Sequence, residues 1–325
     1  MPLKRTELAI LAVASIILGL LLYKFAPGGP LSSDVVGYID SGLNAIRDPF
    51  NLNRYFHILL QAIFARAART PLAGVQAFWA FQVAVGCFLV YVNTRLFSSR
   101  TNPVHGLLAM AIFLSFPTLA TWPGVPFVDL TLMIMIMLMV MVYLLWLDRP
   151  DRPAWLLILL GALVYLSLRT KETAIWSFVL LLGIGFTPED QFSGRTFLRN
   201  LGRLALGILA GIILMALLNW ILVHDPLWGW RPAEWRDYWT VYIDNASSAE
   251  IQPNRENWYT AYLFTAIPVP FLLYVASGIK GLPGTARTRR LLWLVPLAAT
   301  IFLVVTMNNR YGFQNRFFLP AFSLV

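Results

Sequence analysis

Apolar runs of membrane-spanning length, separated by shorter polar segments, recur along the whole chain. A helix needs about 20 apolar residues to cross the hydrocarbon core of a bilayer. The pattern predicts spans at 8–26, 72–92, 104–120, 126–147, 204–223, 259–279 and 291–307, and shorter apolar runs at 154–168 and 173–186. A last run begins at Phe317 and reaches Val325, so we expect the sequence to stop inside a span. We therefore predict one all-α domain over residues 1–325, a polytopic transmembrane helix bundle with about ten spans.

Two polar segments on one side of the predicted bundle are long. The first, residues 27–70, predicts two amphipathic helices beside the membrane, the second of them formed by the sequence RYFHILLQAIFARA at 54–67. In the first helix Ser33 is a good N-cap. At about 100° per residue, Asp34 and Tyr38 fall on the face opposite an apolar stripe that we expect to lie on lipid or on neighbouring spans. The stripe consists of Val36, Ile39, Leu43 and Ile46.

The second long polar segment, residues 224–258, is rich in tryptophan and tyrosine. Aromatic faces suit sugar rings, but the same residues also gather at membrane interfaces because their rings are amphipathic. Both interpretations remain open from the sequence. The tryptophans are Trp228, Trp230, Trp235, Trp239 and Trp258.

The composition agrees with a membrane protein. Apolar residues make up 58% of the chain and charged residues 13%, and the mean hydropathy is +0.66, whereas soluble domains average about 25% charged residues. The net charge of +9 comes from cations scattered between apolar runs. Because they form no basic stripe, we expect no nucleic-acid partner. The single cysteine, Cys87, excludes an intrachain disulfide.

The distribution of charge predicts a cytoplasmic N-terminus. Lys24 and the sequence FAPGGP follow the first apolar run without a small-x-small cleavage motif, so we expect an uncleaved first span. With the N-terminus inside, the inner loops are short and basic, as the positive-inside rule requires. The outer loops are long and hold most of the acidic residues, but they also hold cations that this rule disfavours. An anionic ligand on the outer side would explain those cations.

The tetrapeptide Arg169-Thr170-Lys171-Glu172 lies between the two short apolar runs. Runs of this length span only about 21–23 Å as helices, so the tetrapeptide should lie below the membrane surface. Charges at that depth face a cavity or one another. The sequence leaves two interpretations, a ligand-binding site and an internal Lys–Glu or Arg–Glu pair.

Three further charged residues lie near the outer ends of predicted spans. Arg310 and Arg316 flank the outer end of the last run, in NNRYGFQNRFFLPAF at 308–322. A guanidinium matches phosphate oxygens, but it also anchors a helix at the interface beside aromatic residues. Asp129 lies in the first turn of the span after TWPGVPF, where it binds a ligand or favours the helix terminus through the macrodipole.

In this order the motifs resemble the polytopic GT-C glycosyltransferases, especially the branch of the protein O-mannosyltransferases and the lipid A aminoarabinose transferase. The resemblance covers nearly the whole chain. It rests on Asp34-x-x-x-Tyr38 after the first span, the amphipathic segment with His57, Asp129 at the start of a span, RTKETA at a short hairpin, and NRFFLPA near the C-terminus.

The resemblance implies roles for individual residues. An acid in the first outer loop is the catalytic base, which makes Asp34 the first choice. Val35 stands where relatives often carry a second acid, so Asp40 remains the second choice. The residues implied in substrate binding are Tyr38, His57, Asp129, Lys171, Glu172, Arg310 and Arg316, with the last two arginines and Lys171 as phosphate ligands. No metal ligand and no certain cofactor are implied, and a divalent metal is left open.

The implied reaction is transfer of a sugar from a polyprenyl-phosphate donor to a hydroxyl of a lipid, glycan or protein acceptor. It would take place on the outer face of the membrane with inversion at the sugar carbon. We expect an integral protein of the bacterial inner (plasma) membrane, part of the cell envelope and in contact with membrane lipids. The alternatives are a lipid flippase or transporter, and an O-antigen polymerase or ligase type of enzyme that uses His224 and Arg231.

Overall fold

The structure is a computed structural model of the whole chain. It describes residues 4–25, 33–45, 54–98, 103–115, 119, 124–149, 151–171, 174, 181, 183–185, 193–237 and 240. Within these ranges the chain is all-helical and contains no strand. The helices are α1 (Arg5–Phe25), α2 (Ser33–Asn44), α3 (Tyr55–Ala67), α4 (Pro71–Ser98), α5 (Val104–Leu114), α7 (Val128–Leu147), α8 (Ala154–Leu168) and α9 (Gly194–Val223).

Four of the described helices, α1, α4, α7 and α9, are long and apolar enough to cross a membrane. This confirms the all-α class and the membrane character predicted from the sequence. The helices α5 and α8 are apolar but shorter. The runs predicted at 259–279, 291–307 and from Phe317 lie outside the described residues, as does most of 173–186, so the expected number of spans stays a prediction.

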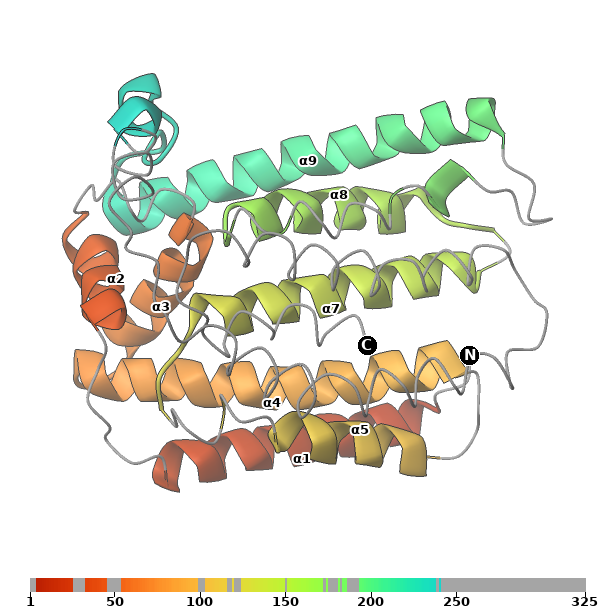
Figure 1. Cartoon of the computed structure of the whole chain (residues 1–325), viewed down its shortest axis with the longest axis horizontal. Coiled ribbons are helices and arrows are strands. Elements are labelled where there is room, and N and C mark those ends of the chain that lie inside the picture. Colours follow the sequence, from red (N-terminus) through yellow and green to blue (C-terminus); the bar gives the residue numbers. More distant parts are fainter. Residues whose placement is uncertain are drawn as a thin grey trace, which may run out of the picture.

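The long helices lie side by side; α4 and α7 run in one direction, and α1, α8 and α9 run in the opposite direction (Figure 1). At one end α1, α5, α8 and α9 begin, and α4 and α7 stop; we call this the basic end because it carries Arg5, Arg149, Arg152, Arg195 and Arg199. At the opposite end α2 and α3 lie across the bundle, next to the first turn of α7 and the last turns of α8 and α9. We call it the capped end.

The centre of the bundle is α7, which is apolar around its whole circumference and buried over most of its length. A helix of this kind must be surrounded by other helices, and α7 packs against both α4 and α8. Its first turn, which carries Asp129, therefore lies inside the capped end and not at the rim of the molecule.

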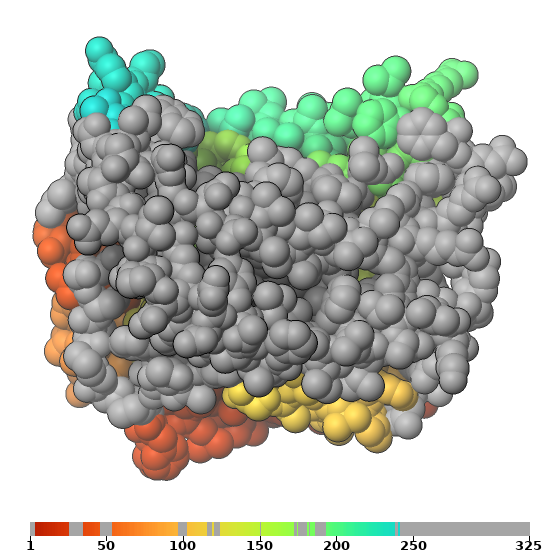
Figure 2. All heavy atoms as spheres, in the orientation of Figure 1, coloured from red at the N-terminus to blue at the C-terminus, as the bar shows by residue number. Residues whose placement is uncertain are grey.

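The helices α1 and α9 present apolar side chains outward. In the view of Figure 2, α9 lies along one edge and α1 along the opposite edge. Exposed side chains on α1 include Ile10, Ile16 and Leu20, and those on α9 include Leu206, Ile213 and Trp220. Apolar surface of this extent on a transmembrane-length helix is what contact with lipid requires.

Two expectations on helix boundaries were wrong. The span predicted from 204 begins at Gly194, because arginines such as Arg195 and Arg199 are good helix formers and Ser193 caps the helix by accepting a hydrogen bond from the Thr196 amide at 3.3 Å. These arginines were expected in a loop. The run predicted over 104–120 ends as a helix at Leu114.

The orientation predicted for the first amphipathic helix was right only in part. Ile39 of the predicted stripe is buried and Leu43 packs beside it. However, Val36 is 44% exposed, and Val35 and Tyr38 are buried in its place. The reason is the neighbour that covers this helix: α3 packs so closely that a Cβ at Gly42 would lie 2.8 Å from the Ala62 Cβ. Tyr38, expected on the polar face, is therefore inside the capped end.

Close packing of α8 on α9 depends on glycine, and this gives a stability prediction. A Cβ at Gly207 would overlap the Ile158 carbonyl oxygen and lie 2.9 Å from the Gly161 Cα. We expect Gly207→Ala to separate the two helices and to lower the free energy of unfolding by about 1–3 kcal/mol, measured by denaturant titration in detergent.

Gly202 is the matched control, because it lies on the same helix and a Cβ there would meet no atom within 4 Å. Gly202→Ala should be neutral or should stabilise the protein by up to about 1 kcal/mol through helix propensity. Equal stability of the two variants would contradict the close contact at Gly207.

Candidate functional site

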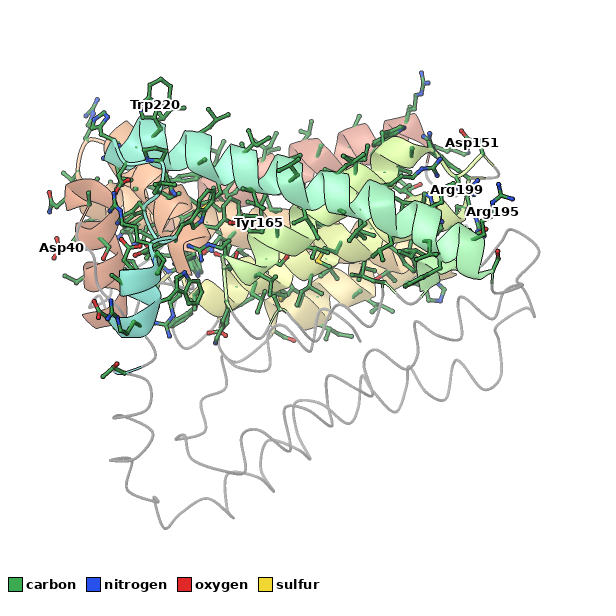
Figure 3. All side chains as sticks on the ribbon, turned by 90° about the horizontal axis from the view of Figure 1, so that it is seen from above. Asp40, Asp151, Tyr165, Arg195, Arg199 and Trp220 are labelled. Atoms are coloured by element: carbon green, nitrogen blue, oxygen red, sulfur yellow. The ribbon has the colours of Figure 1, made fainter. Side chains whose placement is uncertain are left out.

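Four of the residues singled out from the sequence lie together at the capped end. Tyr38 comes from α2, His57 from α3 and Asp129 from α7, and Lys171 follows α8. All four are buried. In Figure 3 this is the end where Asp40 and Trp220 are labelled, opposite the end with Asp151, Arg195 and Arg199.

Asp129 and Lys171 form a buried ion pair. The Lys171 Nζ donates to the Asp129 Oδ1 at 2.5 Å, and the two side chains are 8% and 2% exposed for lysine and aspartate. The second carboxylate oxygen, Oδ2, is buried and has no hydrogen-bond partner in the described part of the chain. Lys171 was expected to pair inside its tetrapeptide or to bind phosphate. In the structure its partner is an acid from α7. The Asp129 carboxylate also lies in the first turn of its helix, where the macrodipole favours negative charge.

His57 is fully buried and contacts the same helix. Its Nδ1 lies 2.7 Å from the Thr131 Oγ1, which also accepts a hydrogen bond from the Gln82 Nε2 at 2.5 Å. The other ring nitrogen of His57, Nε2, is buried without a hydrogen-bond partner among the described residues. Helices α3, α4 and α7 thus share one polar contact inside apolar surroundings.

Tyr38 connects α2 to this cluster. Its ring meets the His57 ring edge-on, with the centroids 5.3 Å apart, and its hydroxyl accepts a hydrogen bond from the Arg54 guanidinium at 2.8 Å. Gln61, one turn after His57, donates to the Val35 carbonyl at 3.4 Å. These contacts fix α2, which carries the candidate catalytic base Asp34, against α3.

The two candidates for the catalytic base are both on α2. Asp34 lies in its first turn, next to the buried Val35, and the side chain of Asp34 lies outside the described part of the structure. Asp40 is exposed and lies at the outer edge of the capped end (Figure 3). The residues beside both acids are buried, namely Val35 next to Asp34, and Ile39 and Ser41 next to Asp40, so the choice of Asp34 over Asp40 stays a prediction.

Sequence reasoning missed several residues at this end. Thr131 and Gln82 complete the contact with His57. Gln82 had a signal, because an amide in the middle of an apolar span marks an internal polar contact. Thr131 had none, because a threonine two residues after Asp129 falls on a different face of the helix.

Arg169 is a further residue of the capped end, and it was not among the selected site residues. Its carbonyl accepts a hydrogen bond from the Phe56 amide at 3.0 Å, which joins the turn after α8 to the start of α3. Its guanidinium lies over the Tyr55 ring, and Tyr55 stacks on Trp228 with the centroids 3.9 Å apart. Trp228 is 1% exposed, so this tryptophan packs inside the protein and not at the membrane interface.

His224 and Arg231 do not approach the cluster through any contact in the described residues. His224 is exposed and ends α9 in the left-handed conformation. Arg231 forms an ion pair with Asp225 at 2.9 Å. Glu172, Arg310 and Arg316 lie outside the described residues, so their roles stay predictions. Among the described residues no group of three or more His, Cys, Asp or Glu is arranged to hold a metal ion.

Burial, and then the charge of Arg54, lowers the pKa of His57 from 6.5 to about 3, although Gln61 acts in the opposite direction. The folded protein therefore holds a neutral imidazole, whereas the unfolded chain takes up a proton near its ordinary pKa. Stability is complete above about pH 6.5 and falls as the pH drops.

We expect a loss of about 2 kcal/mol between pH 7 and pH 5 from this residue, measured as the shift of the unfolding midpoint. His57→Asn should flatten that dependence. His224→Gln is the matched control, because His224 is exposed, and it should keep the slope of the unchanged protein. Parallel slopes in all three proteins would contradict a neutral buried His57.

Comparison with protein-family models, with curated proteins and with solved structures gives no match for this chain. The candidate site therefore rests on its geometry: an ion pair with one open carboxylate oxygen, a neutral histidine and a tyrosine from the first polar segment, all at one end of a membrane bundle. Such a set offers proton acceptors and a cation at one end of the bundle, in a region of low dielectric constant where electrostatic interactions are stronger.

Proposed function

We propose that the chain is a membrane glycosyltransferase of the GT-C type, which moves a sugar from a polyprenyl-phosphate donor to an acceptor hydroxyl. The observation that carries the proposal is the grouping of Tyr38, His57, Asp129 and Lys171 at the capped end. Ionisable residues buried at the end of a membrane bundle mark functional sites by default. The resemblance of the motif order supports the same function.

The proposed location follows from the charge distribution. The basic end carries arginines at the helix termini, and the positive-inside rule would put that end in the cytoplasm of a bacterial inner membrane. The capped end would then face outward. No nucleotide sugar is present there, so the activated sugar must arrive on a lipid that diffuses in the bilayer.

The proposed reaction is a single displacement. Asp34 takes the proton of the acceptor hydroxyl while the hydroxyl oxygen forms a bond to the anomeric carbon, and the bond from that carbon to the phosphate oxygen breaks. The electron pair leaves with the polyprenyl phosphate. Cations then stabilise the growing negative charge, and no acid is needed because phosphate is already a good leaving group. Attack from the face opposite the phosphate inverts the sugar carbon.

The pairing of Lys171 with Asp129 divides the cations between two roles. The Lys171 charge is neutralised by the Asp129 carboxylate, so this lysine offers the donor phosphate less net charge than the sequence suggested. We propose that the pair orients the donor by hydrogen bonding. Arg310 and Arg316 remain the proposed phosphate ligands.

Transfer in proteoliposomes tests the function. The purified chain should move a labelled sugar from a polyprenyl-phosphate donor to lipid, glycan or protein acceptors, and it should not use a water-soluble nucleotide sugar. The same preparation with a divalent-metal chelator tests for a metal requirement. Transfer from the nucleotide sugar alone would overturn the proposal.

The second candidate function is lipid flipping or transport, and the buried Asp129–Lys171 pair is the observation that favours it. Paired ionisable residues inside a bundle also serve as relays and gates in transporters. The two functions differ in product. Movement of a labelled polyprenyl-phosphate sugar across the proteoliposome membrane, without any change in its covalent structure, would favour transport over transfer.

A further inference from the structure

Arg169 is a buried cation that contacts no carboxylate of the described residues. The side chain is 5% exposed. The other buried cations of the described chain have acid partners, since Lys171 pairs with Asp129 and Arg95 with Glu7. Arg169 forms no ion pair in the described ranges. The acid that acts on it electrostatically, Glu234, lies 3.7 Å from the Arg231 guanidinium instead. A buried charge without a counter-charge is costly unless a ligand supplies one.

On one edge of the Arg169 guanidinium, only one of the two N–H donors has a hydrogen-bond acceptor among the described residues. Aromatic rings cover its faces, with its Cζ 5.4 Å from the Tyr55 centroid and 5.8 Å from the Trp235 centroid. On its edge, Nη2 donates to the Gly229 carbonyl oxygen at 3.1 Å, while Nε is buried and has no acceptor in the described part of the chain. The Nε–H and the adjacent Nη2–H form the edge that a carboxylate or phosphate contacts with two oxygens. A single carbonyl oxygen satisfies only one of these donors.

A second buried donor lies in the same turn as Gly229. Trp228 precedes Gly229, and its indole Nε1 is buried without a hydrogen-bond partner among the described residues. Its ring stacks on Tyr55, which also lies under the guanidinium. Two buried N–H donors therefore lack acceptors among the described residues of this region, which also holds unsatisfied acceptor oxygens on Asn219 and Glu234. An unsatisfied buried donor requires an explanation, and a bound group that accepts hydrogen bonds is one.

The turn of residues 225–231 holds the Gly229 carbonyl in this place. Gly229 has a φ of +79°, and a Cβ there would meet the Tyr55 ring and lie 2.7 Å from the Arg169 Nη2. Only glycine allows so close an approach. The turn is tied to α9 by the Asn219 side chain, which donates to the Trp228 carbonyl at 2.9 Å, and is closed by the Asp225–Arg231 pair.

We propose that Arg169 is the central ligand of an oxyanion site that this turn covers, and that the Gly229 carbonyl oxygen takes the place of one ligand oxygen. The ligand chemistry is a phosphate group, which accepts from Nε and Nη2 together and from the Trp228 indole. Binding displaces Gly229 from the guanidinium. This site uses other residues than the Asp129–Lys171 pair and stands whether or not the chain transfers sugar.

Inorganic phosphate and charge-conserving variants test the site. The full chain in nanodiscs of phosphatidylcholine is titrated with phosphate, with chloride at matched ionic strength as reference, and the unfolding midpoint is followed. We expect a saturable rise with phosphate only. Arg169→Lys keeps the charge but lacks the two-donor edge, and it should weaken phosphate binding by about tenfold or more. Trp228→Phe keeps the ring and should weaken it by a few-fold.

Arg231→Lys is the matched control, because Arg231 lies in the same turn and is already paired with Asp225. It should bind phosphate as the unchanged protein does. The same measurement in phosphatidylglycerol nanodiscs without added phosphate identifies the source: a rise there indicates a lipid headgroup, and a rise only with free phosphate indicates a soluble ligand. An equal response of Arg169→Lys and the unchanged protein, or no response to either source, overturns the proposal.

Discussion

Lys171→Met is expected to lower the free energy of unfolding by about 3–5 kcal/mol, because it leaves the Asp129 carboxylate buried without a counter-charge. The pair is nearly inaccessible, with 8% and 2% of the two side chains exposed. A buried ion pair adds little net stability, since desolvation offsets most of the attraction, but the removal of one member exposes the full desolvation cost of the other. Methionine matches the length of the lysine stem, so packing changes little. Denaturant titration in detergent measures the loss.

A double-mutant cycle separates the charge from the packing. Asp129→Asn alone should also destabilise the protein, and the double variant Asp129→Asn/Lys171→Met should recover part of the loss, because no unpaired charge remains. Arg231→Gln is the control for a partly exposed pair, the one that Arg231 forms with Asp225. The Arg231 side chain is 37% exposed, and the loss should stay below about 1 kcal/mol. Additive single losses in the cycle would show that the two side chains do not interact.

The cost of such a pair bears on function. A protein that needed only stability would fill this place with apolar side chains, which are often at least as stable as a buried ion pair. The pair is therefore better explained by a role in function than by a contribution to stability. The Asp129 Oδ2 and the His57 Nε2 both lack a hydrogen-bond partner among the described residues, and both belong to side chains at the first turn of α7.

The sequence predicted most of the helices, because the bilayer requires long apolar runs. The predicted spans 126–147 and 154–168 agree with α7 and α8 to within two residues. The start of α9 was missed because a helix that continues beyond the apolar region has no hydropathy signal there. The buried face of α2 was predicted only in part because it depends on α3, and α3 was expected at the membrane interface and not inside the bundle.

The candidate site was predicted residue by residue, but its contacts were not. Asp129 and Lys171 both attracted attention as charges near apolar runs, yet their pairing joins positions 42 residues apart, and no local pattern encodes it. The same holds for His57 and Thr131, which are 74 residues apart. Arg169 was noticed as part of a charged tetrapeptide. Its burial and the lack of an acceptor for its Nε among the described residues are properties of the fold that the tetrapeptide does not encode.

Asp34→Asn is expected to lower sugar transfer by roughly a hundredfold to ten-thousandfold, the range over which a positioned general base accelerates a reaction. Asparagine keeps the size of the side chain and its ability to cap the first turn of α2, but it cannot accept a proton from the acceptor hydroxyl. The change therefore removes the proton acceptor and should leave the fold unchanged. Transfer from a polyprenyl-phosphate sugar in proteoliposomes measures the activity, and the yield and unfolding midpoint verify the fold.

Asp40→Asn is the matched control for Asp34→Asn, because it makes the same change on the same helix at an exposed position. We expect it to retain near-normal transfer, since an exposed carboxylate is surrounded by water and is not held against the buried cluster of Tyr38 and His57. If Asp40→Asn loses transfer and Asp34→Asn retains it, Asp40 is the base and the acceptor must approach from the outer edge of α2. If both variants retain transfer, the base is not on α2. The open oxygen of Asp129 would then be the next carboxylate to test, and its pairing with Lys171 would have to break during the reaction.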